Sequence, residues 1–155
     1  MKTLVIGAAI IDIIMKIKRL PKSGEDILCS ETVSAVGGCA YNVAGTLRGF
    51  GVDHDLFVPV GRGMYGDMIA GDLEKLGYQI LIREEESDNG YCLCLVEEDG
   101  ERTFITVKGA EGRFRPSWFE QLSQYAYDSI YVAGYQVCGT SGGVISDWMA
   151  GAKDR

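Results

Sequence analysis

The chain has 155 residues, of which 46% are hydrophobic and 24% charged, and it holds 21 Gly against 3 Pro. This composition is that of an ordinary globular domain, and it excludes disordered and collagen-like chains. The net charge of −7, from 15 basic and 22 acidic residues, gives no electrostatic reason to bind nucleic acid or anionic lipid. A small-molecule ligand is therefore favoured.

The apolar stretch near the start predicts neither a membrane span nor a signal peptide. It runs from Leu4 to Met15 with Asp12 inside it, which is shorter than the roughly 20 residues of a spanning helix, and no small-residue cleavage site follows. The 5 Cys are an odd count without a C-x-x-C pair, which argues against a disulfide framework or a structural zinc site. We expect a cytoplasmic protein.

Apolar spacing then predicts alternating strands and helices. Residues 3–10 form a continuous apolar run, typical of a strand buried on both faces, and the elements expected next are a helix over 40–50, a strand over 56–60, a helix over 65–76 and a strand over 78–82. In the second helix, the side chains expected to face inward are Met68, Ile69, Leu73 and Leu76. The connections are too long for hairpins, so the pattern predicts a parallel sheet covered by helices. The single histidine, His54, lies in a turn and is expected in solvent.

Other segments have the texture of a small antiparallel sheet that stands off the main one. Residues 27–35 alternate in polarity, and residues 91–96 and 102–107 flank Asp99-Gly100, a hairpin signal. The elements expected after them are a helix over 116–125, a buried strand over 129–135 and a helix over 143–153. A helix that leaves a parallel sheet normally leads into another strand, so we expect the first half of a larger fold.

The segment Gly37-Gly38-Cys39-Ala40-Tyr41-Asn42 is the strongest candidate for a binding site. Glycines let a ligand approach the backbone, and free N–H groups at a helix start bind polar oxygens; a plain Gly-rich turn is the alternative. Asp12 is expected just beyond the carboxyl end of the first strand, where open α/β sheets bind ligands; a solvated strand end is the alternative. A carboxylate together with a carboxamide suits the vicinal hydroxyls of a sugar.

Six motifs in register resemble the ribokinase, or PfkB, family of carbohydrate kinases. They are Gly7 with Asp12, Pro21-Lys22-Ser23-Gly24-Glu25, Gly37-Gly38 followed by Asn42, the segment from Val60 to Gly66, Glu98-Asp99-Gly100-Glu101-Arg102, and Gly109-Ala110. The resemblance implies a ribokinase-like α/β fold, in which a Rossmann-like parallel sheet flanked by helices carries a small antiparallel β lid. Residues 1–155 would be the N-terminal half of a single domain, with lid segments at about 13–36 and 88–109 and the C-terminal part missing.

The same resemblance implies transfer of the ATP γ-phosphate to a hydroxymethyl oxygen of a sugar or nucleoside. ATP and Mg²⁺ would be the cofactors of the intact enzyme, a monovalent cation is a further candidate, and a homodimer would form through the lid. By position, the substrate-binding residues would be Asp12, Gly37, Gly38 and Asn42, with Ile10 at the pocket wall and Cys92, Cys94 and Thr106 covering the sugar. Simple packing in the lid is the alternative for the two cysteines. The family's catalytic G-A-G-D motif is absent from this sequence, so no catalytic residue is expected here and the chain alone is expected to be inactive.

Four positions depart from the family's pattern. Gly63 stands where Asp is usual, Asn89 where Thr often precedes Gly90, Glu111 where Asn often follows Gly-Ala, and Tyr135 near the carboxylate that ribokinases proper use for the sugar. These departures argue against ribose itself as the substrate.

Two other functions stay open. Gly61, Gly63 and Gly66 form a G-x-G-x-x-G between an expected strand and helix, with Glu84 downstream, which imitates an NAD-binding fingerprint. Against it, Asp67 places a negative charge at the helix start. The other alternative is a non-catalytic sugar-binding remnant, because a family scaffold does not by itself supply an activity.

Overall fold

The structure, a computed structural model, describes residues 1–122 and 126–151. Its main sheet is centred on β1 (Lys2–Ile6), which lies between two parallel neighbours, β4 (Asp53–Phe57) and β9 (Ser129–Val132). Leu4, Val5 and Ile6 are fully buried, because the central strand of a parallel sheet is covered on both faces. A short parallel pair, β5 (Pro59–Val60) with β6 (Ile82–Arg83), follows β4.

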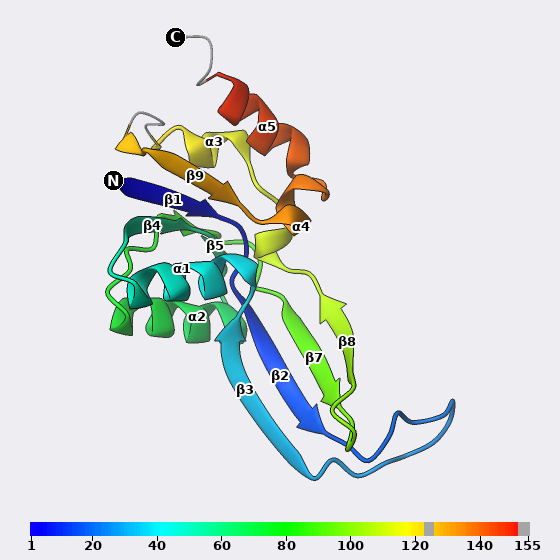
Figure 1. Cartoon of the computed structure of the whole chain (residues 1–155). Helices are drawn as coiled ribbons and strands as arrows, with labels where there is room; N and C mark the ends of the chain where they lie inside the picture. Colours follow the sequence, from blue (N-terminus) through cyan, green and yellow to red (C-terminus); the bar gives the residue numbers. More distant parts are fainter. Residues whose placement is uncertain (123–125, 152–155) are drawn as a thin grey trace.

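Helices cover both faces of this sheet (Figure 1). One face carries α1 (Cys39–Gly49) and α2 (Met64–Lys75), and the other carries α3 (Pro116–Phe119) and α5 (Gly142–Ala150), while α4 (Gly134–Val137) directly follows β9. The buried side chains divide in the same way. Val5, Leu56 and Ile69 belong to the cluster under α1 and α2, whereas Ile6, Phe57 and Ile145 belong to the cluster under α3 and α5.

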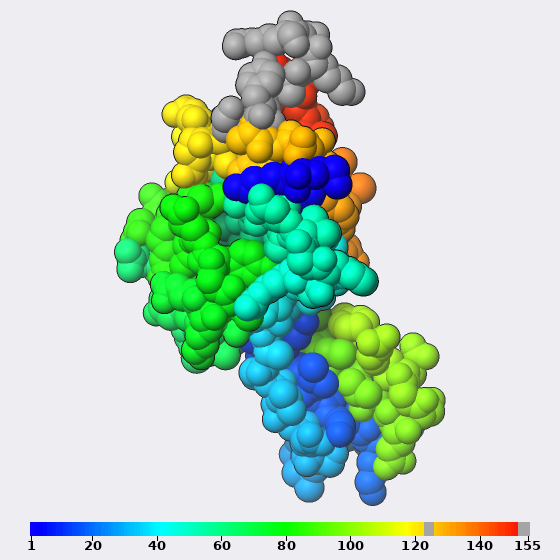
Figure 2. All heavy atoms as spheres, turned by 60° about the vertical axis from the view of Figure 1, so that its left-hand side comes forward, coloured from blue at the N-terminus to red at the C-terminus, as the bar shows by residue number. Residues whose placement is uncertain are grey.

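Four further strands form a separate sheet, which we call the lid. Its strand order is β3-β2-β7-β8, with β2 (Ile10–Lys16), β3 (Glu31–Gly37), β7 (Tyr91–Val96) and β8 (Arg102–Val107). Figures 1 and 2 show the lid projecting from the main body as an arm. Tyr91 at its base packs against Tyr65 of α2 with the ring centroids 5.1 Å apart. After β8 the chain returns to the body through η1 (Ala110–Gly112).

The predicted fold class is confirmed: a parallel sheet flanked by helices carries a smaller sheet that stands off it. The hairpin predicted over 91–96 and 102–107 has those bounds, and Gly100 takes a φ of 87° in its turn. The lid is not antiparallel throughout, because its central pair, β2 with β7, is parallel. Both strands leave the main body and run outward, so they share one direction.

The prediction of one strand over residues 3–10 is wrong. β1 ends at Ile6 and the lid strand β2 starts at Ile10. At the break, a Cβ on Gly7 would lie 2.7 Å from the Ala40 Cβ and 2.9 Å from the Ala133 Cβ, so the chain turns where two other elements press on its backbone. The sequence does not reveal this break, because the apolar run continues without interruption from β1 into β2.

Several other predicted boundaries also shift. The strand over 56–60 is divided at Val58 into β4 and β5, and β5 starts with Pro59, which has no N–H for a ladder. The remaining expected elements appear as β3 in place of 27–35, β6 in place of 78–82, α3 in place of 116–125, β9 in place of 129–135 and α5 in place of 143–153. Residues 123–125 and 152–153 of the two predicted helices lie outside the described residues. Met68, predicted to face inward, is 41% exposed.

The prediction that His54 is a solvated turn residue is wrong. It lies at the start of β4 and is half-buried. Its Nδ1 lies 2.7 Å from the Val52 carbonyl and its Nε2 lies 2.7 Å from the Tyr78 hydroxyl. An Nδ1–H donor and an Nε2 acceptor would satisfy both contacts, so His54 holds the segment after α2 against β4.

Candidate functional site

Asp12 lies within β2, at the base of the lid. The sequence had predicted it just beyond the carboxyl end of the first strand. In the lid sheet it is opposite Ala35 of β3 and Cys92 of β7. Its carboxylate covers Gly37 so closely that any Cβ at that position would collide with Oδ2. Asp12 is half-buried and accepts no hydrogen bond from the residues that the structure describes. Burial raises the pKa of this carboxyl group. Because no described residue donates to them, its oxygens are available for hydrogen bonds with a ligand.

One face of the lid carries most of the other predicted site residues. Thr106 of β8 lies opposite Cys92, and its Oγ1 is 3.4 Å from the Cys92 Sγ. Asp12, Cys92 and Thr106 therefore form a row across three neighbouring strands. Cys94 belongs to the next row of the same face, and burial raises the pKa of its thiol. Both cysteines are buried, which agrees with the alternative of packing in the lid, and their contact with a ligand stays a prediction.

The glycine pair brings the start of α1 to the same place. Gly38 precedes α1 with a φ of 100°, and a Cβ there would lie 2.5 Å from the Ala8 carbonyl oxygen. Only glycine tolerates this conformation and this approach. Ile10 pairs with Gly37 in the lid register. The predicted residues Ile10, Asp12, Gly37 and Gly38 thus meet where the chain passes from the main sheet to the lid.

Asn42 is placed differently. It lies on the exposed side of the first turns of α1, and its backbone carbonyl accepts a hydrogen bond of 3.0 Å from Thr46 Oγ1. Its side-chain amide makes no hydrogen bond within the described part of the chain, and Asn42 lines an outer hollow with Arg48 and Tyr78. Within residues 1–122 and 126–151, Asn42 makes no hydrogen bond to Asp12. The role of Asn42 in the site therefore stays a prediction.

Sequence reasoning missed Gln136. This residue of α4 is 8% exposed, and its Oε1 is a buried acceptor without a hydrogen-bond partner among the described residues. A Cβ on Gly7 would lie 3.5 Å from that oxygen, which places Gln136 where the carboxyl ends of β1 and β9 meet. Ligands of open α/β sheets bind at this edge, and that rule could have singled out a polar residue directly after the expected last strand.

Comparisons with known proteins identify the family of this chain. A family model described as the pfkB family of carbohydrate kinases matches residues 1–150. The uncharacterized sugar kinase YegV of Escherichia coli (strain K12) is 37% identical over 151 residues, which make up 97% of this chain and 47% of that protein. This chain belongs to the PfkB family.

Several solved structures are similar in fold to this PfkB chain. The ribokinase of Giardia lamblia has a TM-score of 0.85 and 23% identity, covering 98% of this chain and 50% of that one. The ribokinase of Cryptococcus neoformans var. grubii serotype A, in complex with ADP, has a TM-score of 0.67 and 20% identity, covering 86% of this chain and 41% of that one. The chain thus has the ribokinase-like fold and spans about half the length of the relatives it matches.

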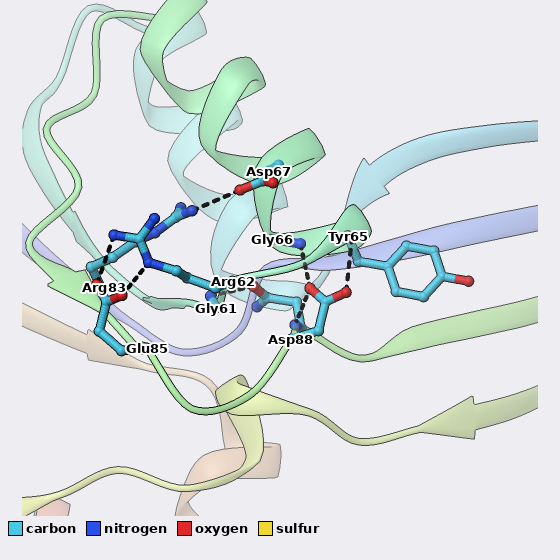
Figure 3. Close-up of polar contacts among 9 residues, drawn as sticks. Gly61, Arg62, Tyr65, Gly66, Asp67, Arg83, Glu85 and Asp88 are labelled. Atoms are coloured by element: carbon cyan, nitrogen blue, oxygen red, sulfur yellow. Dashed lines mark hydrogen bonds and ion pairs between the residues drawn. The ribbon is translucent and has the colours of Figure 1, made fainter.

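The NAD-binding alternative is not favoured, because the start of α2 is already occupied (Figure 3). The Asp88 carboxylate accepts hydrogen bonds from the backbone N–H groups of Tyr65, at 3.1 Å, and Gly66, at 2.6 Å. A pyrophosphate would need those same donors. Glu84, the residue expected to bind a ribose, is 5% exposed and pairs with Arg115 at 2.7 Å.

Two of the four departures from the family pattern, Asn89 and Glu111, join the lid to the body in a region we call the lid junction (residues 88–90 and 109–111), and a third, Gly63, packs against it. Asp88 fills the space beside Gly63, where any Cβ would collide with its carboxylate. Asn89 Oδ1 accepts from the Gly61 N–H at 2.6 Å, and its Nδ2 donates to two backbone carbonyls, those of Ala9 and Pro59. The Glu111 carboxylate accepts from the N–H groups of Gly90, at 2.8 Å, and Gly109, at 2.9 Å.

Proposed function

We propose that this chain supplies the sugar-binding and lid half of a kinase that transfers the γ-phosphate of ATP to a hydroxymethyl oxygen of a sugar or nucleoside. The observation that carries the proposal is the half-buried Asp12 carboxylate. It has no hydrogen-bond donor among the described residues, and it lies between the Gly37-Gly38 turn and the lid face that holds Cys92 and Thr106. Such a carboxylate suits a ligand rich in hydroxyl groups.

The substrate would lie between the lid and the carboxyl ends of the main strands. Asp12 would accept hydrogen bonds from two hydroxyls, and Gln136 Oε1, a buried acceptor without a partner among the described residues, would accept a third. Ile10 and the lid residues Cys92, Cys94 and Thr106 would form the walls. Gly37 and Gly38 would let the ligand approach the backbone, and Asn42 would contribute from α1. The lack of a carboxylate at Tyr135 argues against ribose.

ATP is supported as the phosphate donor by family membership and by the ADP bound to the Cryptococcus neoformans ribokinase. Mg²⁺ would accompany ATP in the intact enzyme. Among residues 1–122 and 126–151 there is no group of three or more His, Cys, Asp or Glu side chains that could hold a metal ion. We therefore assign no Mg²⁺ ligand and no phosphate-transfer step to this chain.

Substitution of Asp12 tests the proposal. Loss of a charged hydrogen-bond partner costs about 1.5–3 kcal/mol, so Asp12→Ala should weaken binding of the sugar roughly ten- to a hundredfold. Asn42→Ala removes a neutral partner worth about 0.5–1.5 kcal/mol and should weaken it less. Calorimetry on the intact enzyme with pentoses, hexoses and nucleosides would measure both effects and identify the substrate.

Glu98→Ala, in the exposed turn of the lid hairpin, is the matched control and should bind like the wild type. ATP affinity should change little in any of the three variants. Unchanged sugar affinity in Asp12→Ala would show that the sugar site does not lie at the base of the lid.

A further inference from the structure

A hollow of about 470 Å³ opens where the chain leaves the lid. Its walls come from the loop after β6, the end of the lid junction, the segment after η1 and the turn before α5. The volume falls within the range of roughly 300–1,000 Å³ that small-molecule sites occupy. Asp12, Gly38, Cys92 and Gln136 do not line it, so it is separate from the candidate sugar site.

The acidic residues of the hollow are neutralised in part, by one arginine. Glu84 lies 2.7 Å and Glu86 3.3 Å from the same Arg115 guanidinium group. Glu84 also accepts a hydrogen bond of 2.9 Å from the Glu86 backbone N–H. Arg115 thus pairs with both carboxylates that line the hollow.

The basic residues of the hollow are not all neutralised. Lys108 and Arg113 both line it, and neither has an ion-pair partner within the described part of the chain. Glu111, close in sequence to both, uses its two carboxylate oxygens on the backbone N–H groups of Gly90 and Gly109. Three basic side chains against two acidic ones leave the lining of the hollow with a net charge of +1, on a chain whose net charge is −7.

Hydroxyl groups add neutral hydrogen-bonding capacity. Ser87 is exposed at the rim, and its hydroxyl makes no hydrogen bond to another described residue. Thr140 already donates to the Gly112 carbonyl at 3.2 Å, so it can act only as an acceptor. The side-chain donors without a partner are thus those of Lys108, Arg113 and Ser87. This set matches the oxygens of a phosphate group.

We propose that this hollow binds a phosphate group, either as the free ion or as a phosphomonoester of a small metabolite. Lys108 and Arg113 would neutralise its charge, and Ser87 would donate a hydrogen bond. The inference does not depend on the proposed kinase activity, because none of these residues belongs to the candidate sugar site.

Calorimetric titration of the chain with inorganic phosphate, and separately with glycerol 3-phosphate, tests this proposal. Each of Lys108→Gln and Arg113→Gln should weaken binding roughly ten- to a hundredfold, since each removes a charged hydrogen-bond donor. Tighter binding of the ester than of the free ion would identify a metabolite as the ligand, and equal binding would identify phosphate itself. Both residues are exposed, so the variants should keep the thermal midpoint of the wild type.

Lys18→Gln and Arg48→Gln are the matched controls, because both residues are exposed, lie outside the hollow and lack an ion pair with any described residue. They should bind phosphate like the wild type. The proposal is wrong if the wild type shows no saturable binding, if Lys108→Gln and Arg113→Gln bind as tightly as the wild type, or if the controls lose as much affinity as they do. Asp12→Ala should leave phosphate binding intact, which separates this site from the sugar site.

Discussion

At the scale of single residues, a polar side chain of the lid junction caps the start of α2, which has no capping side chain of its own. α2 begins after Gly63, which has no side chain and therefore cannot cap its own helix. Asp88, which lies far along the chain, accepts the hydrogen bonds of the Tyr65 and Gly66 N–H groups instead. A carboxylate at a helix start also interacts favourably with the helix dipole. The start of α2 and the base of the lid are therefore fixed by one side chain.

Asp88→Ala should lower the free energy of unfolding by about 0.5–2 kcal/mol, the usual cost of a lost helix cap. Glu85→Ala, in the same loop but exposed and paired only with Arg62, should cost less, because solvent screens exposed ion pairs. Urea denaturation of both variants measures the difference. Equal effects would contradict the capping role.

Gly63→Ala should destabilise the wild type in two ways, because Gly63 has a φ of 138° and a Cβ would collide with Asp88. In the background of Asp88→Gly the collision is removed and only the backbone strain remains. The two substitutions should therefore be non-additive by at least about 0.5 kcal/mol in a double-mutant cycle. Additive effects would mean that the two residues do not contact each other in solution.

Asp12 should give the stability of the free chain an unusual pH dependence. Burial raises the pKa of Asp12 in the folded state above its value in the unfolded chain. Its protonated form then stabilises the fold below the unfolded pKa, about 3.9, and that contribution is lost as the pH rises through the folded pKa. Asp12→Asn should thus be more stable than the wild type at pH 7, with a difference that shrinks on acidification.

Glu25 supplies a control of opposite sign. The hydrogen bond from Arg19 lowers the pKa of Glu25 to about 2, so its contribution is present at neutral pH and is lost as the pH falls through that value. Glu25→Gln should be no more stable than the wild type at pH 7, and any difference should vanish toward pH 2. Denaturant titrations between pH 2 and 7 would compare the variants. A stability difference for Asp12→Asn that does not depend on pH would contradict the burial of its carboxyl group.

At the scale of elements, the lid exposes strands that other proteins pair or cover. β3 and β8 are its two outer strands, and four apolar side chains remain exposed on it, namely Val33 at 47%, Phe104 at 58%, Ile105 at 52% and Val107 at 44%. Exposed edges with apolar faces are sites of association. A homodimer through the lid remains our prediction for this chain.

Ile105→Lys tests the dimer, because Ile105 lies on the lid face opposite to that of Cys94 and Phe104 and so avoids the candidate sugar site. Light scattering should give a dimer for the wild type and a monomer for Ile105→Lys, since the buried charge would lack a partner. Glu98→Lys in the hairpin turn should remain dimeric. A monomeric wild type would show that the lid does not associate.

Local patterns predicted the lid hairpin to the residue, because alternating polarity and the Asp99-Gly100 turn depend only on neighbouring residues. The break between β1 and β2 was not predictable in this way, because it depends on the approach of Ala40 and Ala133 to Gly7. The same limit applies to the site. Its glycine turn and Asp12 could be named from the sequence. Gln136 could have been noticed as a polar residue after the last expected strand, but the burial of its Oε1 depends on the placement of β1 beside β9.

At the scale of the whole molecule, the described residues contain no helix long and apolar enough to cross a membrane. They contain a candidate substrate site but no recognisable phosphate-transfer machinery. We therefore expect binding of a sugar and its phosphorylation to be separable in this chain.

We expect the chain of 155 residues to show no turnover in a coupled ADP-release assay with ATP, Mg²⁺ and any sugar, because phosphoryl transfer needs positioned phosphates and a base near the acceptor. Full-length YegV, assayed over the same panel of sugars, serves as the comparison. Turnover by residues 1–155 alone would place catalytic groups within this half. Sugar binding without turnover would support the division of labour proposed above, and also the alternative of a non-catalytic remnant.

The position of β1 has a consequence for the order of folding. Its two neighbours are far apart along the chain: β4 is complete by Phe57, but β9 begins only at Ser129, whose hydroxyl lies 2.7 Å from that of Thr3 across 126 residues of sequence. During synthesis, one edge of the central strand therefore stays unpaired until most of this chain has left the ribosome. Contacts of such large sequence separation form slowly, and in that interval the open edge of β1 is the surface most in need of protection from aggregation.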